Sequence, residues 1–168
     1  MAEQREPDQA GALLTLHRYF CWATTLQKRL KEAGGCLSET ISEERTSAGV
    51  DLRNASADLL TFMDLSQLIS GDFGLYFFYY YGTLYVVVEG FCDLKLRDTA
   101  VEKLLRSPHT DALRRSRNGA FHFQKEYLTP KLLDPYLGED DFVDWAFSLH
   151  DALRACINRE LTAARLLS

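Results

Sequence analysis

The feature that most constrains the fold is a run of sixteen residues, 73–88, that contains no charged side chain and is crowded with Phe, Tyr and Val. These residue types favour a β-strand, and Gly82 lies where a hairpin would turn. A lone hairpin among helical segments would, however, leave its strand edges unpaired. We therefore expect a buried central helix that continues to about Lys95. The run carries five tyrosines and is shorter than the roughly 20 apolar residues of a membrane span, so we expect no membrane segment.

Before this run, apolar residues recur at helical spacing in two stretches. Residues 13–30 predict a first amphipathic helix, which the glycine pair Gly34-Gly35 should end. Residues 59–69 predict a second helix. Residues 36–54, between the two, are polar and lack a sustained period, so we expect a mobile crossover connection there.

After the run, three further helices are expected. Thr99 and Glu102 form a capping-box pattern that opens a short helix. Ser107-Pro108 should start the next helix, which we expect to run to about Leu128, because proline is well tolerated at the first helical position. The last helix should follow a cap at Asp140 or Asp141 and bury apolar side chains between residues 142 and 161.

These elements predict an all-α fold in one domain, residues 1–168. A chain of 168 residues with 46% apolar side chains can build one ordinary core and is too short for two. No apolar stretch follows a basic N-terminal segment, so we expect a cytoplasmic protein without a signal or transit peptide. The four cysteines are scattered and lack the spacing of zinc ligands, so we expect no metal and no cofactor.

Charge is distributed unevenly along the chain. The net charge of −5 argues against a broad electrostatic grip on nucleic acid, yet residues 103–125 hold six Lys or Arg and one acidic residue. That stretch contains Arg117-Asn118-Gly119-Ala120-Phe121-His122. Arg is a permanently charged fork that suits phosphate oxygens, and His exchanges protons near neutral pH. Together they can cleave RNA without a metal.

The expected helix does not by itself bring these two side chains together. Arg117 falls within the apolar face, and His122 lies about 140° further round the axis, near Asn118. A two-fold dimer could unite both copies of the helix in one composite site. Alternatively, Arg117 pairs with a buried carboxylate and His122 is a solvated surface residue. Arg114 and Arg115 are candidates for contacts with RNA phosphates, whereas His17, His109 and His150 show no partner pattern and receive no role.

The order Arg117-Asn118-x-x-x-His122, late in an all-helical domain, resembles the HEPN superfamily, whose signature is Arg, four to six residues and His. The resemblance is specific over residues 113–123 and looser over the order of the helices. It implies a bundle of four to five helices that dimerises with two motifs facing each other. It also implies a metal-independent endoribonuclease, of the kind found in toxin-antitoxin, phage-defence or RNA-processing systems, acting on single-stranded or looped RNA.

The resemblance assigns roles to the motif residues. His122 would take the proton from a ribose 2′-OH, Arg117 would hold the phosphate, and Asn118 would orient the histidine or the phosphate. Glu89 is an accessory candidate, because some members of the family bring a carboxylate into the site from a neighbouring helix. Other members are non-catalytic interaction or nucleotide-binding modules that act with an antitoxin or a nucleotidyltransferase, and that function is the alternative.

Overall fold

The computed structural model describes residues 9–48, 70–125 and 141–164, with side chains described from residue 9 to residue 34 in the first of these ranges. The described residues form five helices and no strand, which confirms an all-α fold. The helices are α1 (Gln9–Ala48), α3 (Asp72–Asp93), α4 (Thr99–Leu105), α5 (His109–Phe121) and α7 (Phe142–Ala163).

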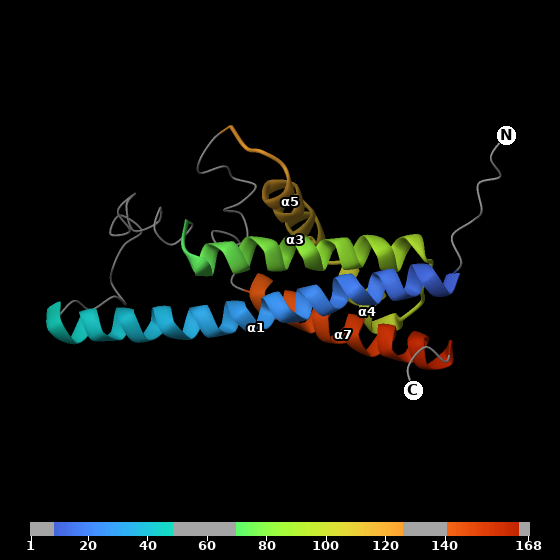
Figure 1. Cartoon of the computed structure of the whole chain (residues 1–168), viewed down its shortest axis with the longest axis horizontal. Coiled ribbons are helices and arrows are strands. Elements are labelled where there is room, and N and C mark those ends of the chain that lie inside the picture. Colours follow the sequence, from blue (N-terminus) through green and yellow to red (C-terminus); the bar gives the residue numbers. More distant parts are fainter. Residues whose placement is uncertain (1–8, 49–69, 126–140, 165–168) are drawn as a thin grey trace.

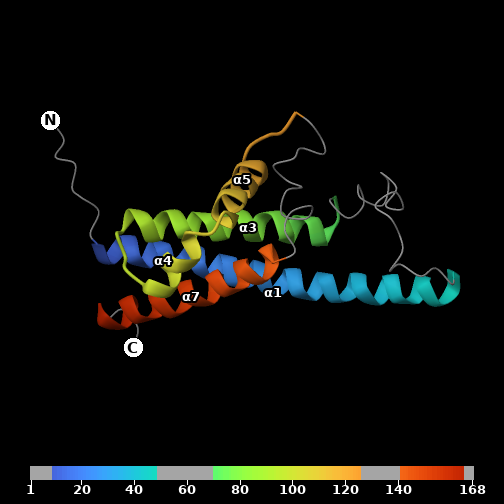
Figure 2. The same ribbon diagram turned by 180° about the vertical axis from the view of Figure 1, so that it is seen from behind.

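Three long helices, α1, α3 and α7, lie side by side, and α3 and α7 run in the opposite direction to α1 (Figures 1 and 2). The short helix α4 packs against α7, while α5 crosses α3 at a steep angle. The core lies between the long helices, where Tyr80, Leu84, Leu149 and Leu153 are completely buried. Burying one such side chain contributes about 1.5–3 kcal/mol.

The uncharged run is helical, as predicted, and forms most of α3. Its buried positions include neighbours along the sequence, among them Tyr80, Tyr81 and Gly82, because α1, α5 and α7 all contact this helix. Burial on several sides therefore overrides the strand preference of the Tyr and Val side chains. The helix ends at Asp93, and Lys95 takes the left-handed conformation with a φ of 52°.

The predicted end of the first helix is wrong. α1 continues through Gly34-Gly35 to Ala48, so residues 36–48 are helical and not a crossover loop. Glycine permits left-handed conformations but also adopts helical ones, at a cost of about 1 kcal/mol relative to alanine. The remainder of the expected connection, residues 49–54, and the predicted helix at 59–69 lie outside the described residues.

Asp98 caps α4, in place of the predicted Thr99, which is the first residue of the helix. The Asp98 carboxylate accepts hydrogen bonds from the backbone N–H groups of Ala100 at 2.9 Å and Val101 at 3.1 Å. It also lies 3.0 Å from Arg159 Nη1, which ties α4 to α7. These bonds, that of Val101 first, hold the pKa of Asp98 below its usual value.

Both ends of α5 differ from the prediction. The helix begins at His109, one residue after the predicted Pro108, which lies at the cap position. Ser107 Oγ accepts a hydrogen bond from the His109 N–H at 3.3 Å. The helix ends at Phe121, well before the expected Leu128. α7 follows Asp141, as predicted, although that carboxylate makes no capping bond and lies 3.0 Å from the Nε2 atom of His109.

Candidate functional site

Helix α5 lies close to α3 because α3 has a glycine at the crossing. A Cβ atom on Gly82 would lie 3.1 Å from the ring of Phe121 and 3.3 Å from the Cβ of Ala120. Leu113, Ser116 and Gly119 are buried along the same helix. This packing places Arg117 at the boundary between α5 and α3, on the apolar side where the sequence predicted it.

Arg117 is held by two side chains. Its Nη2 atom lies 3.5 Å from Glu89 Oε2 on α3, and its Nη1 atom donates a hydrogen bond to Asn118 Oδ1 at 3.1 Å. The arginine side chain is 32% exposed and that of Glu89 is 39% exposed, so both remain accessible to a ligand. The buried Nε atom of Arg117 has no hydrogen-bond partner among the described residues. The guanidinium is therefore oriented by Glu89 and Asn118.

His122 follows α5 and is exposed, with an extended backbone (φ −123°, ψ 139°). The Gln124 side-chain amide donates to the carbonyl of His122 at 2.7 Å and to the carbonyl of Asn118 at 3.2 Å. The His122 imidazole makes no hydrogen bond or ion pair to the described residues, and it does not line the pocket that contains Arg117. Within the described residues, the structure thus groups Arg117, Asn118 and Glu89 and gives the imidazole of His122 no partner.

Arg114 and Arg115 are exposed on α5. The Nη2 atom of Arg114 lies 3.2 Å from Asp111 Oδ1 one turn earlier, and both side chains are more than half exposed. Such a surface pair is worth about 0–1 kcal/mol, so Arg114 can exchange Asp111 for a phosphate at little cost.

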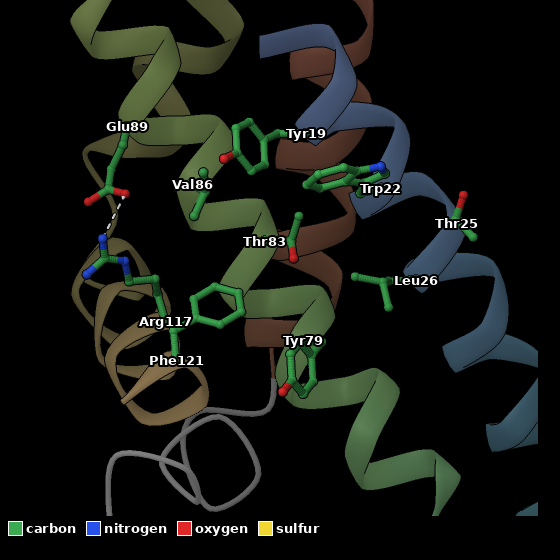
Figure 3. Close-up of a pocket in the computed structure, with 10 residues that line it drawn as sticks. All are labelled: Tyr19, Trp22, Thr25, Leu26, Tyr79, Thr83, Val86, Glu89, Arg117 and Phe121. Atoms are coloured by element: carbon green, nitrogen blue, oxygen red, sulfur yellow. Dashed lines mark ion pairs between the residues drawn. The ribbon is translucent and has the colours of Figure 1, made fainter. Parts of the chain in front are cut away.

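A pocket of about 720 Å³ opens between α1, α3 and α5 (Figure 3). Arg117 and Glu89 lie at one end of it, and most of the other lining side chains are aromatic or aliphatic. The described residues that line it are Tyr19, Trp22, Thr25, Leu26, Tyr79, Thr83, Val86, Glu89, Arg117 and Phe121. Sequence reasoning did not find the α1 residues. The feature that could have indicated them is the position of Tyr19 and Trp22, one turn apart, beside the apolar face of the helix and not within it; Trp22 is exposed.

Two of the histidines without an assigned role belong to the core. His109 is buried against the rings of Phe142 and Trp145. His150 is completely buried, and its Nε2 atom lies 3.2 Å from Thr24 Oγ1. Burial lowers the pKa of His150 to about 4, so it is neutral at pH 7. Neither side chain lines the pocket at Arg117.

Comparison with protein-family models, with curated proteins and with solved structures finds no match for this chain. Among the described residues, no three His, Cys, Asp or Glu side chains form a group that could hold a metal ion. In the same part of the chain, no helix is long and apolar enough to span a bilayer.

Proposed function

We propose that this chain is a metal-independent endoribonuclease of the HEPN type, active as a homodimer. The observation that carries the proposal is the orientation and exposure of the Arg117 guanidinium. Its guanidinium is oriented by Glu89 and Asn118, remains partly exposed and borders an open pocket. Five residues later, His122 offers an imidazole that makes no bond to the described part of the fold.

The chemistry follows from these two side chains. The neutral imidazole of His122 would remove the proton from a ribose 2′-OH as that oxygen attacks the adjacent phosphorus. The new bond from the 2′-oxygen forms while the bond to the 5′-oxygen breaks, and the 5′-oxygen takes a proton from solvent or from the imidazole of the second copy. The products are a 2′,3′-cyclic phosphate and a 5′-hydroxyl, and no metal is needed.

Arg117 would bind the phosphate and stabilise the charge that develops on its oxygens. Charge-assisted bonds from a guanidinium are strong, and they contribute most when the group is oriented before the reaction. Asn118 supports that orientation, because its Oδ1 atom accepts a bond from Nη1. Glu89 supports it from the other side, as the carboxylate that holds Nη2. In this proposal Asn118 and Glu89 are positioning residues.

A two-fold dimer explains why His122 lies outside the pocket of its own Arg117. In the composite arrangement, the arginine of one copy and the histidine of the other serve the same phosphate. Mixing inactive Arg117→Ala and inactive His122→Ala proteins tests this, because each mixed dimer would contain one intact pair. Restored cleavage after mixing supports the composite site, whereas two variants that stay inactive together contradict it.

The alternative is a non-catalytic module that binds a nucleotide or a partner protein through the same pocket. The position of His122 favours it, since the imidazole does not line the pocket at Arg117. An RNA cleavage assay distinguishes the two functions. Labelled RNA is incubated in EDTA with the wild type, with His122→Ala, and with His17→Ala as a histidine control outside the pocket. Cleavage by the wild type and the control, leaving 2′,3′-cyclic ends, supports the enzyme. RNA left intact by all three supports the module.

Growth in cells provides a second test of the same proposal. A ribonuclease of this kind would act in the cytoplasm as a toxin or in phage defence, and an antitoxin would restrain it. Unopposed expression should then arrest growth, and His122→Ala should restore it. Equal growth with both proteins, at equal soluble expression, argues against an active ribonuclease.

A further inference from the structure

The pocket beside Arg117 has two aromatic walls. On α1, the rings of Tyr19 and Trp22 meet edge to face, with centroids 5.1 Å apart. Opposite them, Tyr79 of α3 and Phe121 of α5 form a second edge-to-face pair at 5.7 Å. Thr83 and Val86 lie between the walls (Figure 3).

These walls are exposed to a degree that core packing does not require. Trp22 is 51% exposed, Phe121 43% and Tyr79 42%. Large aromatic side chains contribute much to stability when buried, so three of them left half-open around one pocket indicate a ligand with flat apolar faces.

Positive charge lines the pocket at one end, where Arg117 of α5 lies. Arg18 is not part of the lining, but its guanidinium carbon lies 5.6 Å from the Trp22 ring centroid and 5.7 Å from that of Tyr19. Among the described residues of the lining, Glu89 is the one acidic side chain, and it is paired with Arg117. A ligand with a flat ring and a phosphate matches this arrangement, because the ring stacks while the phosphate reaches an arginine.

We infer that this pocket takes one unpaired nucleobase of a single-stranded RNA, stacked against the aromatic walls, with an adjacent phosphate on Arg117. The inference rests on the proposed function and names the form of its substrate. A volume of about 720 Å³ lies within the 300–1,000 Å³ usual for small-ligand sites and admits a nucleoside. A base within a duplex is stacked on its neighbours and cannot enter, so the enzyme should select single strands and loops.

The other occupant to test is a second copy of this chain. A stable protein interface buries about 800 Å² on each partner and is commonly flat with an apolar centre. The pocket is instead concave and is lined at one end by Arg117. Those features favour the nucleotide.

Binding is measured with a single-stranded 2′-O-methyl RNA ten-mer, which keeps its bases and phosphates but lacks the nucleophilic hydroxyl. It should quench the fluorescence of the exposed Trp22. Trp22→Ala should weaken binding about tenfold or more, the usual effect of losing a stacking partner, whereas Trp22→Phe should stay within about threefold of the wild type. Leu14→Ala is the control, since Leu14 is a 46% exposed residue of α1 outside this pocket.

Two further probes identify the base as the bound group. The same ten-mer paired with its complement should bind far more weakly, and a ten-mer of abasic nucleotides should bind wild type and Trp22→Ala alike. Equal affinity of wild type and Trp22→Ala for the base-containing strand overturns the inference. The inference is also overturned if Trp22→Ala loses RNA binding only because it no longer dimerises, which sedimentation measures.

Different experimental results would overturn the inference and the proposed function. Cleavage that persists with an unchanged KM in Trp22→Ala overturns the base pocket and leaves the ribonuclease intact. Base-dependent binding through Trp22, without cleavage of ordinary RNA, overturns the ribonuclease and leaves a nucleic-acid pocket in a binding module.

Discussion

The guanidinium of Arg117 on α5 lies 3.5 Å from the carboxylate of Glu89 on α3, in residues 28 positions apart in the sequence. Both side chains remain more than 30% exposed. An ion pair in this setting contributes about 0–1 kcal/mol to folding, far less than the burial of the core around it. The pair is therefore better suited to orienting a group that binds a ligand than to stabilising the fold.

Replacing Arg117 with glutamine should separate stability from activity. We expect Tm to fall by less than about 4 °C, because the lost pair is partly exposed and Glu89 can be hydrated in its absence. RNA cleavage should fall by about 100-fold or more, the usual effect of removing a group that stabilises transition-state charge. Thermal melting and initial cleavage rates check both parts.

Arg154→Gln is the matched control, since Arg154 also forms an exposed ion pair, with Asp151 on α7. It should alter neither Tm nor cleavage by more than the error of the assay. A drop of about 10 °C in Tm for Arg117→Gln alone would show that the guanidinium is a structural group of the core.

Replacing Glu89 with glutamine should strengthen RNA binding and slow cleavage. The carboxylate competes with a phosphate for Nη2 of Arg117, so its neutralisation should tighten binding of the 2′-O-methyl ten-mer by up to about fivefold. The guanidinium then loses one of its two orienting partners, and kcat should fall. Glu102→Gln provides the control, because Glu102 pairs with Arg97 away from the pocket. Weaker binding in Glu89→Gln would mean that the carboxylate itself contacts the RNA.

The helical conformation of α3 was predictable because the segments on either side of it show helical periodicity. Residues 73–88 have the composition of a strand, yet the helical periodicity around them indicated a helix, and α3 is one. The length of α1 was not predictable, because Gly34-Gly35 permits either outcome. The end of α5 was missed because it coincides with side-chain bonds from Gln124 to two carbonyls, and glutamine has no such regular role in sequence patterns.

The sequence named Arg117, Asn118 and Glu89, which the structure brings together, and His122, which lies outside the pocket at Arg117; it did not predict the surroundings of these residues. Arg117, Asn118 and His122 stand close in sequence, whereas the aromatic walls come from α1 and α3 and depend on how these helices fit together. That fit rests on contacts such as Gly90 against Leu16, where an added Cβ would lie 2.8 Å from the leucine Cδ1 atom. No local pattern reveals which residues of two distant helices will meet at such a contact.

RNA binding should depend only weakly on salt. Arg117 lines the pocket, Arg18 lies against the Trp22 ring, Arg114 is paired with Asp111, and the chain has a net charge of −5. Contacts to about two or three phosphates predict a slope of about −2 in a plot of log K against log salt for a single strand. Titrations of the 2′-O-methyl ten-mer at KCl concentrations between about 50 and 300 mM provide the slope. A slope steeper than about −4 would indicate an extended basic surface and contradict a confined site.

Stability should fall as the pH drops from about 6.5 towards 4, because of His150. Its pKa is lowered by burial from 6.5 to about 4, so below pH 6.5 the unfolded chain binds a proton that the folded chain excludes. The resulting loss of stability is about 2 kcal/mol at pH 5 and is absent above pH 7.

His150→Gln removes this titration, and His17→Gln is the control that keeps it. Urea unfolding at pH 7.5 and pH 5 should show a smaller loss in His150→Gln than in the wild type and the control. An identical loss in all three proteins would mean that His150 is protonated in the fold, or that other groups determine the acid sensitivity.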